Sequence, residues 1–374
     1  MLYGVTAWFP SLAATKRNQV INVLTNLQRR AAIMIAGAFK SMSAAALNVE
    51  LFLLPIQLQI EQIIQETAIR IQTGAKWAQP FCLSTLGKRT AKETRLGGFS
   101  PLEKLRWKKD GILFGRGQWE SKRAFVLPPW EKRIDCIIQD SDAAIKSHDQ
   151  IISNQRKMVF FTDESGYEGK VGASAVAPDR GIQARRFLGS TEQATVYAAE
   201  LAGIEMAIDK FKLSQNQSQK GPSELVIFAD SRAAIQAVEN PNPPSGQHIL
   251  RAIYAHARSL RTPTLSNPTD EVSITIRRSP AHVGVPGNEL ADAAAKNAAL
   301  GGAENAGEDA GSEDQFPRLT ATVKQQVRRR IQERWALSWA KEKTGKPNQK
   351  LVQTPHRKML QLFTGPKHYT SILV

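Results

Sequence analysis

The central part of the chain consists of short apolar runs separated by glycine and proline. Five runs have the composition and two-residue alternation of β-strands, namely MVFFTD, KVGASAVAP, RRFLG, LVIFAD and VSITIRR. Apolar residues at helical spacing predict helices over Thr195–Lys212, Ser231–Glu239, Gln247–Arg261 and Asn288–Ala299. The order of these elements predicts an α/β fold with a five-stranded mixed sheet and flanking helices.

The N-terminal part has the pattern of amphipathic helices. A helix over Lys16–Ala38 places on one face Val20, Val23, Leu24, Leu27, Ala31 and Met34. A second helix is predicted to start at Ser43, which is a good N-cap, and a third to run from Ile56 until Gly74 stops it. This part therefore predicts a helical module of about 75 residues.

A basic segment near the other end is predicted to form one helix over Leu319–Glu342. We interpret its apolar stripe as packing rather than chemistry; the stripe consists of Val327, Ile331, Trp335 and Trp339. Composition predicts five parts of the chain: a helical remnant (1–75), a basic and partly ordered linker (76–154), the α/β domain (155–300), an acidic flexible linker (301–317) and a basic helical segment (318–374).

Composition excludes several classes of protein. With 42% hydrophobic residues and seven Trp among 374 residues, the chain is not of the disordered class. Cys82 and Cys136 are far apart, which excludes a disulfide framework and a zinc ribbon and fits a reducing compartment. The longest apolar stretch, Val49–Ile60, is too short to span a bilayer, and no secretory signal is visible at the start. We expect neither a membrane partner nor a small-molecule cofactor.

The net charge of +16 favours a polyanionic partner, and its distribution is uneven. Residues 157–299 contain 15 bases and 15 acids, whereas residues 316–374 contain 13 bases and two acids. In the 76–154 segment, Lys and Arg alternate with Trp107 and Trp119. A solvated charge run is the favoured interpretation there, with contact to nucleic acid as the alternative. The surplus charge thus predicts nucleic-acid contacts through the flanks.

Three acids stand in apolar surroundings. Alternation places Asp163 and Asp230 at the carboxyl ends of two buried strands, where ligands of open α/β sheets bind. Within about 40° of Glu200 on its helix lie Val196, Ile204, Ala207 and Phe211. A buried carboxylate needs a cation or a proton, and neither strand offers a base. A shared Mg²⁺ or Mn²⁺ explains all three acids.

Asp292 and His282 carry less information by themselves. Asp292 lies on an Ala-rich helix beside Lys296, where a solvated acid is the ordinary case. His282 lies in the loop SPAHVGVPGNE, and a loop histidine is more often a surface residue than a catalyst.

Four ordered motifs carry a family resemblance. FTDES, YAAELAGIEMAI, FADSRAAI and AHVGVPGNELAD resemble type 1 ribonuclease H, in particular the domain attached to reverse transcriptases of LINE-like (non-LTR) retrotransposons. The resemblance implies the ribonuclease H-like fold and hydrolysis of the RNA strand of RNA–DNA hybrids with two Mg²⁺ ions, Mn²⁺ being possible. It implies that Asp163, Glu200, Asp230 and Asp292 hold the metal ions, with Asp163 as the bridge, and that His282 moves a proton.

The chain departs from the family pattern at three places. Glu164 stands where glycine is common; alternation places it on the face opposite Asp163, so we expect little effect on the metal ligands. Val196 and Tyr197 replace small or polar residues ahead of Glu200, which weakens the case for minor-groove recognition of 2′-hydroxyls. Arg277 and Arg278 replace a common Trp.

The flanks resemble the same polyproteins. The N-terminal helices are similar to those after a polymerase palm in fungal LINE-like elements, and PHRKMLQLFTGPKHYTSILV is similar to the region before a Cys/His-rich segment. No pair of adjacent aspartates follows Tyr-Ala or a relative, so polymerase activity is not expected. We interpret the chain as truncated at both ends.

Two other functions remain open from the sequence. The chain could be a catalytically inactive nucleic-acid-binding remnant, although the complete set of acids favours an enzyme. An integrase or resolvase of related fold is the other alternative, but its acids would stand in other contexts and it would lack the HVGVPGNELAD loop.

Overall fold

The computed structural model describes residues 2–74, 119–139, 148, 150–154, 156–217, 222–241, 245–261, 272–279, 285–301, 316–344 and 346–357. These residues form two compact units. One contains the described residues of Met1–Ile71 and Lys324–Val374, and the other contains those of Gln72–Phe81 and Arg116–Val323. His282, Cys82, Trp107 and most of the predicted acidic linker lie outside the described residues.

A mixed sheet forms the centre of the second unit. Its strands are β1 (Asp135–Ile137), β2 (Lys157–Tyr167), β3 (Lys170–Ala177), β4 (Ile182–Ser190), β5 (Glu224–Ala229) and β6 (Ser273–Arg278), in the order β1-β6-β5-β2-β3-β4. The β2–β3 and β3–β4 pairs are antiparallel, whereas β2, β5, β6 and β1 are parallel to one another. The predicted α/β fold with a mixed sheet is confirmed.

The sheet has six strands, so the prediction of five was wrong. The additional strand, β1, pairs with β6 through Asp135↔Thr275 and Ile137↔Arg277. It lies in the segment predicted to be a linker and is three residues long. So short a run cannot establish a two-residue alternation, and its place in the sheet comes from a partner about 140 residues away in the sequence.

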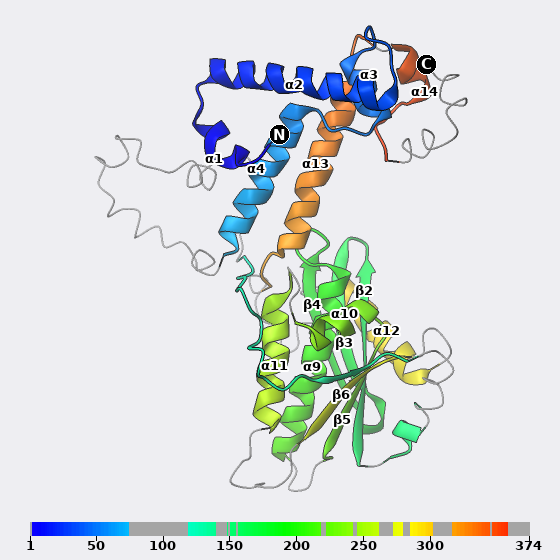
Figure 1. Cartoon of the computed structure of the whole chain (residues 1–374). Helices are drawn as coiled ribbons and strands as arrows, with labels where there is room; N and C mark the ends of the chain where they lie inside the picture. Colours follow the sequence, from blue (N-terminus) through cyan, green and yellow to red (C-terminus); the bar gives the residue numbers. More distant parts are fainter. Residues whose placement is uncertain are drawn as a thin grey trace. The chain divides into compact units, whose positions relative to one another are not determined.

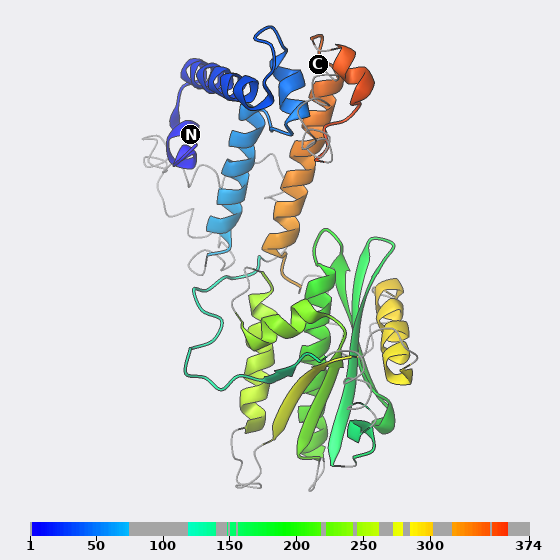
Figure 2. The same ribbon diagram turned by 45° about the vertical axis from the view of Figure 1, so that its right-hand side comes forward.

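Helices cover both faces of this sheet. They are α9 (Val196–Gln217), α10 (Arg232–Glu239), α11 (Gln247–Arg261) and α12 (Pro286–Leu300). Figures 1 and 2 show α9 and α11 on one face and α12 on the other. On the first face Phe160 packs in the large core, and on the other Phe161 and Phe228 stack with ring centroids 5.4 Å apart. As predicted, β2 is therefore a central strand that is buried on both sides.

Two glycines allow α12 to lie close to the sheet. A Cβ atom on Gly172 of β3 would lie 2.5 Å from the carbonyl oxygen of Ala295, and one on Gly287 would lie 2.3 Å from the ring of Phe161. Oγ of Ser174 donates a hydrogen bond of 2.7 Å to the carbonyl oxygen of Ala291. These contacts fix the height of α12 above β2 and β3.

A segment ahead of β1 joins the same unit through a buried acid. Glu120, 1% exposed, accepts hydrogen bonds from Oγ of Ser245 (2.8 Å), from N of Gly246 (2.8 Å) and from N of Thr320 (2.6 Å). Thr320 begins α13 (Thr320–Ala340), so Glu120 satisfies an amide of the first turn of that helix. One carboxylate therefore connects three separate parts of the chain.

The other unit is helical. It contains α1 (Val5–Trp8), η1 (Phe9–Ser11), α2 (Ala14–Ala36), α3 (Ala44–Glu50), α4 (Ile56–Gln72), most of α13 and α14 (Lys346–Leu351). Arg328 and Arg334 of α13 form ion pairs with Glu66 (2.8 Å) and Glu61 (2.5 Å) of α4, and the two helices run side by side (Figures 1 and 2). The stripe predicted to pack on α13 is buried, as expected.

The apolar face predicted for α2 is only partly covered. The helix is present, but Val23 is 60% exposed and Met34 is 83% exposed. The helical period was predicted correctly, whereas burial depends on neighbouring elements that a periodic pattern does not specify. Within the described ranges, no helix is both long and apolar enough to cross a membrane.

Candidate active site

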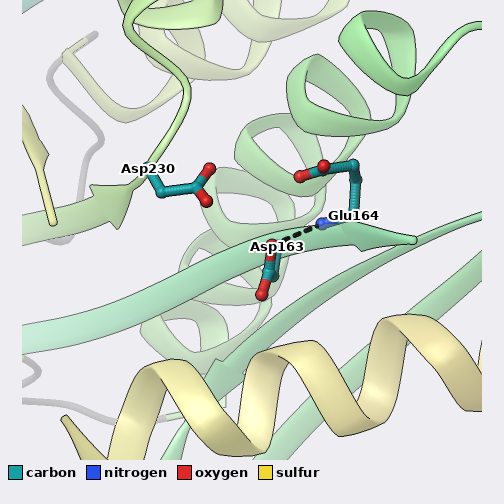
Figure 3. A group of neighbouring side chains, drawn as sticks. All are labelled: Asp163, Glu164 and Asp230. Atoms are coloured by element: carbon teal, nitrogen blue, oxygen red, sulfur yellow. Dashed lines mark hydrogen bonds between the residues drawn. The ribbon is translucent and has the colours of Figure 1, made fainter. Parts of the chain in front are cut away.

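Asp163 and Asp230 meet at one edge of the sheet. Strands β2 and β5 are parallel and in register through Thr162↔Ala229, so the residues that follow this pair lie next to each other. Figure 3 shows Asp163 on β2 and Asp230 just after β5. Carboxylate oxygens of Asp163, Glu164 and Asp230 all lie within 4.8 Å of one another. The structure thus brings together two of the acids predicted from the sequence.

Glu164 is the third member of this group, although it is not among the site residues predicted from the sequence. Its side chain leaves β2 on the face opposite Asp163, as alternation predicts (Figure 3), and its backbone N–H donates to Oδ1 of Asp163 at 2.9 Å. Asp230, however, lies beyond the end of β5, where the sheet no longer separates the two faces. The prediction that Asp163 ends its strand was wrong, because β2 continues to Tyr167 in its pairing with β3; only the pairing with β5 stops at Thr162. Asp163 and Glu164 can therefore both approach Asp230, from opposite faces of β2.

Glu200 lies beside this group, on α9. It is 2% exposed, and the carboxylates of Glu164 and Asp230 lie near enough to raise its pKa. No partner for its Oε2 atom exists among the described residues. Burial, and after it the carboxylates of Glu164 and Asp230, raises the pKa of Glu200 far above the usual range. The predicted burial of Glu200 is confirmed, but Val196, predicted on the same buried face, is 44% exposed because it is the first residue of the helix.

Burial and repulsion dominate the electrostatics of the cluster. Burial raises the pKa of Asp163, and the nearby charges of Glu164 and Asp230 raise it further. Within the described part of the chain, none of the four acids Asp163, Glu164, Glu200 and Asp230 forms an ion pair with Lys or Arg. Oε2 of Glu164 is also buried without a described partner. Oxygen donors left unsatisfied in this way fit a hard divalent cation such as Mg²⁺ or Mn²⁺.

Asp292 is not part of the close group. Its side chain, on α12, is 43% exposed, and its Oδ2 atom lies 2.6 Å from Nζ of Lys296, one helical turn later. Lys296 also interacts electrostatically with Asp163. The ion pair of Asp292 and Lys296 is therefore near the cluster, on the side where α12 packs. His282 lies outside the described residues. Of the five predicted site residues, Asp163, Glu200 and Asp230 thus lie in one cluster, Asp292 lies outside its close group, and His282 is not described.

A family comparison agrees with this geometry. Residues 155–300 match the family model described as RNase H. This part of the chain is an RNase H domain. The chain therefore carries the domain of ribonuclease H enzymes, and the RNase H domain includes every acid of the cluster and also Asp292 and His282.

Solved structures include similar chains. Ribonuclease H1 from the halophilic archaeon Halobacterium salinarum is 20% identical, with 38% of this chain and 96% of that chain covered and a TM-score of 0.26. The N-terminal RNase H domain of a Mycobacterium tuberculosis protein, solved as a fusion with maltose-binding protein, is 17% identical, with 38% and 98% covered and the same TM-score. No relative was found among curated proteins.

Proposed function

We propose that the RNase H domain hydrolyses the RNA strand of RNA–DNA hybrids with two Mg²⁺ ions. One observation carries this proposal: three carboxylates meet where the pairing of the parallel strands β2 and β5 ends, beside a buried Glu200 with an unsatisfied oxygen. Such a cluster is costly without cations, because like charges and desolvation both oppose ionisation. Cations at this edge of the sheet would offset that cost.

Four acids would bind the ions. Asp163 and Asp230 present carboxylates from the sheet, Glu200 presents one from α9, and Asp292 is available from α12 once Lys296 moves away. When bound, two divalent ions would activate the attacking water and stabilise the charge that develops on the leaving 3′ oxygen. We propose that His282 accepts or returns a proton in this step. The products would carry 5′-phosphate and 3′-hydroxyl ends.

Charge supports a nucleic-acid substrate. The segment 157–299 is formally neutral, whereas 13 Lys and Arg lie in residues 316–374, so we propose that the basic flanks bind phosphates outside the active site. We also propose that the chain derives from a LINE-like retroelement, on the basis of the motifs in its flanks and RNase H domain.

A catalytically inactive nucleic-acid-binding protein is the second candidate. The observation in its favour is the ion pair of Asp292 with Lys296, which occupies one of the four predicted metal-binding acids. Such a protein would bind hybrid and leave it intact.

The test is a cleavage assay that compares substrates. An RNA–DNA hybrid with one labelled strand at a time is incubated with the full chain and Mg²⁺, beside DNA and RNA duplexes of the same sequence. We expect cuts in the RNA strand of the hybrid alone, with 5′-phosphate ends and no cuts in EDTA. Binding of hybrid without cleavage would favour the second candidate, and cleavage of a DNA duplex would point to a different nuclease.

A further inference from the structure

We propose that Glu164 is an additional metal-binding carboxylate of this site, acting with Glu200 and Asp230 on the side of β2 that faces α9. The proposal rests on the proposed metal-dependent function and adds a ligand to it. Glu164 stands where type 1 ribonucleases H commonly have glycine, so the set of acids that the sequence resemblance implies does not include it.

The geometry of Glu164 is that of a ligand. Its carboxylate lies within 4.8 Å of donor atoms of both Asp163 and Asp230, the distance over which carboxylates can share an ion. It also lies near enough to Glu200 to raise the pKa of that carboxyl. Figure 3 shows the carboxylates of Glu164 and Asp230 on the same side of the β2 ribbon, with Asp163 pointing to the other side.

Glu200 supplies an independent indication that something binds there. This side chain is 98% buried, since its exposed fraction is 2%, and it is directed at Glu164 and Asp230. Its Oε2 atom has no hydrogen-bond partner among the described residues, and the same holds for Oε2 of Glu164. Two buried carboxylate oxygens without a hydrogen-bond partner, on residues whose charges interact, require a cation or a proton nearby.

A purely structural role for Glu164 finds no support in its surroundings. Its neighbour across the β2–β3 pair is Ala173, which is fully buried and offers no charge. Among the described residues no base forms an ion pair with Glu164. A surface glutamate would be solvated, whereas this one is half-buried against three other acids and therefore destabilises the fold without a cation.

Glu164 compensates for a negative charge that Lys296 neutralises elsewhere in the site. Lys296 pairs with Asp292 and so offsets one of the four acids that the family resemblance assigns to the metals. Glu164 restores the lost negative charge on the opposite side of β2. Affinity for a divalent ion increases with the number of charged ligands.

The experiment is a calorimetric titration of the full chain with Mn²⁺. Glu164→Gln should weaken Mn²⁺ binding by about tenfold or more, since it removes a ligand but keeps the shape of the side chain. The matched control is Glu168→Gln, the same change on an exposed residue of the β2–β3 hairpin, which should bind as the unmodified chain does. A smaller loss in Glu164→Gln, or tighter binding, would overturn the proposal.

Two further measurements, the melting temperature and the rate of hybrid cleavage, distinguish a failure of this proposal from an effect on folding and from a failure of the proposed function. In EDTA, Glu164→Gln should melt at a higher temperature than the unmodified chain, because it relieves repulsion; a structural role would lower it. Hybrid cleavage is measured on the same preparations. If the unmodified chain cleaves hybrid and Glu164→Gln binds Mn²⁺ normally, only the role of Glu164 is wrong. If Mn²⁺ binding falls and the unmodified chain does not cleave, only the proposed reaction is wrong.

Discussion

Nζ of Lys296 lies 2.6 Å from Oδ2 of Asp292, one turn earlier on α12. This ion pair raises the pKa of Lys296 and holds an acid that the sequence predicts to be a metal ligand. Metal binding at Asp292, as we propose it, would therefore have to compete with Lys296.

Replacing Lys296 should strengthen Mg²⁺ binding at the active site. Lys296→Met should lower the Mg²⁺ concentration for half-maximal cleavage by about two- to fivefold, the size expected when an exposed ion pair no longer competes. The measurement is a Mg²⁺ titration of the cleavage rate, with Lys212→Met near the far end of α9 as the control. An unchanged midpoint in Lys296→Met would mean that Asp292 is not a ligand.

Gly172 sets the distance between β3 and α12. In Gly172→Ala the new Cβ would lie 2.5 Å from backbone atoms of Ala295 and Ala299, which cannot move without shifting the helix. We expect a loss of about 1–3 kcal/mol in the free energy of unfolding, measured with urea. At Gly166 the nearest atom is a side-chain carbon of Val196 at 3.3 Å, so Gly166→Ala is the milder control. Equal stabilities for the two variants would contradict the close packing of α12.

Glu120 should be essential to the stability of the unit that contains the sheet. Glu120→Ala leaves three donors without an acceptor, those of Ser245, Gly246 and Thr320. The expected cost is about 3 kcal/mol, because hydrogen bonds to a buried carboxylate are strong and their donors stay buried. Glu289→Ala, on the exposed first turn of α12, is the control for urea unfolding. The role of Glu120 is refuted if both variants unfold at the same urea concentration.

Glu50 should make the helical unit less stable at higher pH. Burial raises the pKa of Glu50 from 4.5 to about 7, and a hydrogen bond from Asn348 opposes this increase in part. Because the pKa of Glu50 is higher in the folded state than in the unfolded state, its protonation stabilises the fold. This stabilisation is complete below the pKa of the unfolded state, about 4.5, and is lost as the pH rises through about 7.

Glu50→Gln should remove that part of the pH dependence. Between pH 4.5 and pH 8, the free energy of unfolding should fall by roughly 1–3 kcal/mol less in the variant than in the unmodified chain, because Gln does not ionise. Denaturant unfolding across this pH range, with Glu61→Gln as the control on α4, provides the measurement. Parallel pH profiles for the unmodified chain and Glu50→Gln would contradict the account.

The sequence predicts most of the α/β unit because its elements are long and periodic. Helix α11 has the predicted bounds, and Ser231 caps α10 by accepting a hydrogen bond from N of Ala234, as an N-cap should. Asp163 and Asp230 were predictable as neighbours because β2 and β5 are parallel, although β2 continues past Asp163 to Tyr167.

The features that the sequence did not predict depend on tertiary contacts. Strand β1 is too short to show a period, and the exposure of Met34 depends on elements that do not cover α2. The proximity of Glu164 to Asp230 was not predicted, because alternation assigns a face but does not show that Asp230 lies past the end of its strand. Its position directly after Asp163 was the available signal. The pairing of Asp292 with Lys296 follows an i,i+4 spacing that was visible in the sequence.

The most direct test of the central claim is cleavage of a labelled RNA–DNA hybrid in Mg²⁺ by the unmodified chain, Asp163→Asn and Asp179→Asn. Asp179 lies in the exposed turn η3 (Pro178–Arg180) and controls for the loss of one negative charge. The account predicts that the unmodified chain and Asp179→Asn cleave the RNA strand at similar rates, and that Asp163→Asn is slower by about a hundredfold or more. No cleavage by the unmodified chain, or undiminished cleavage by Asp163→Asn, would contradict it.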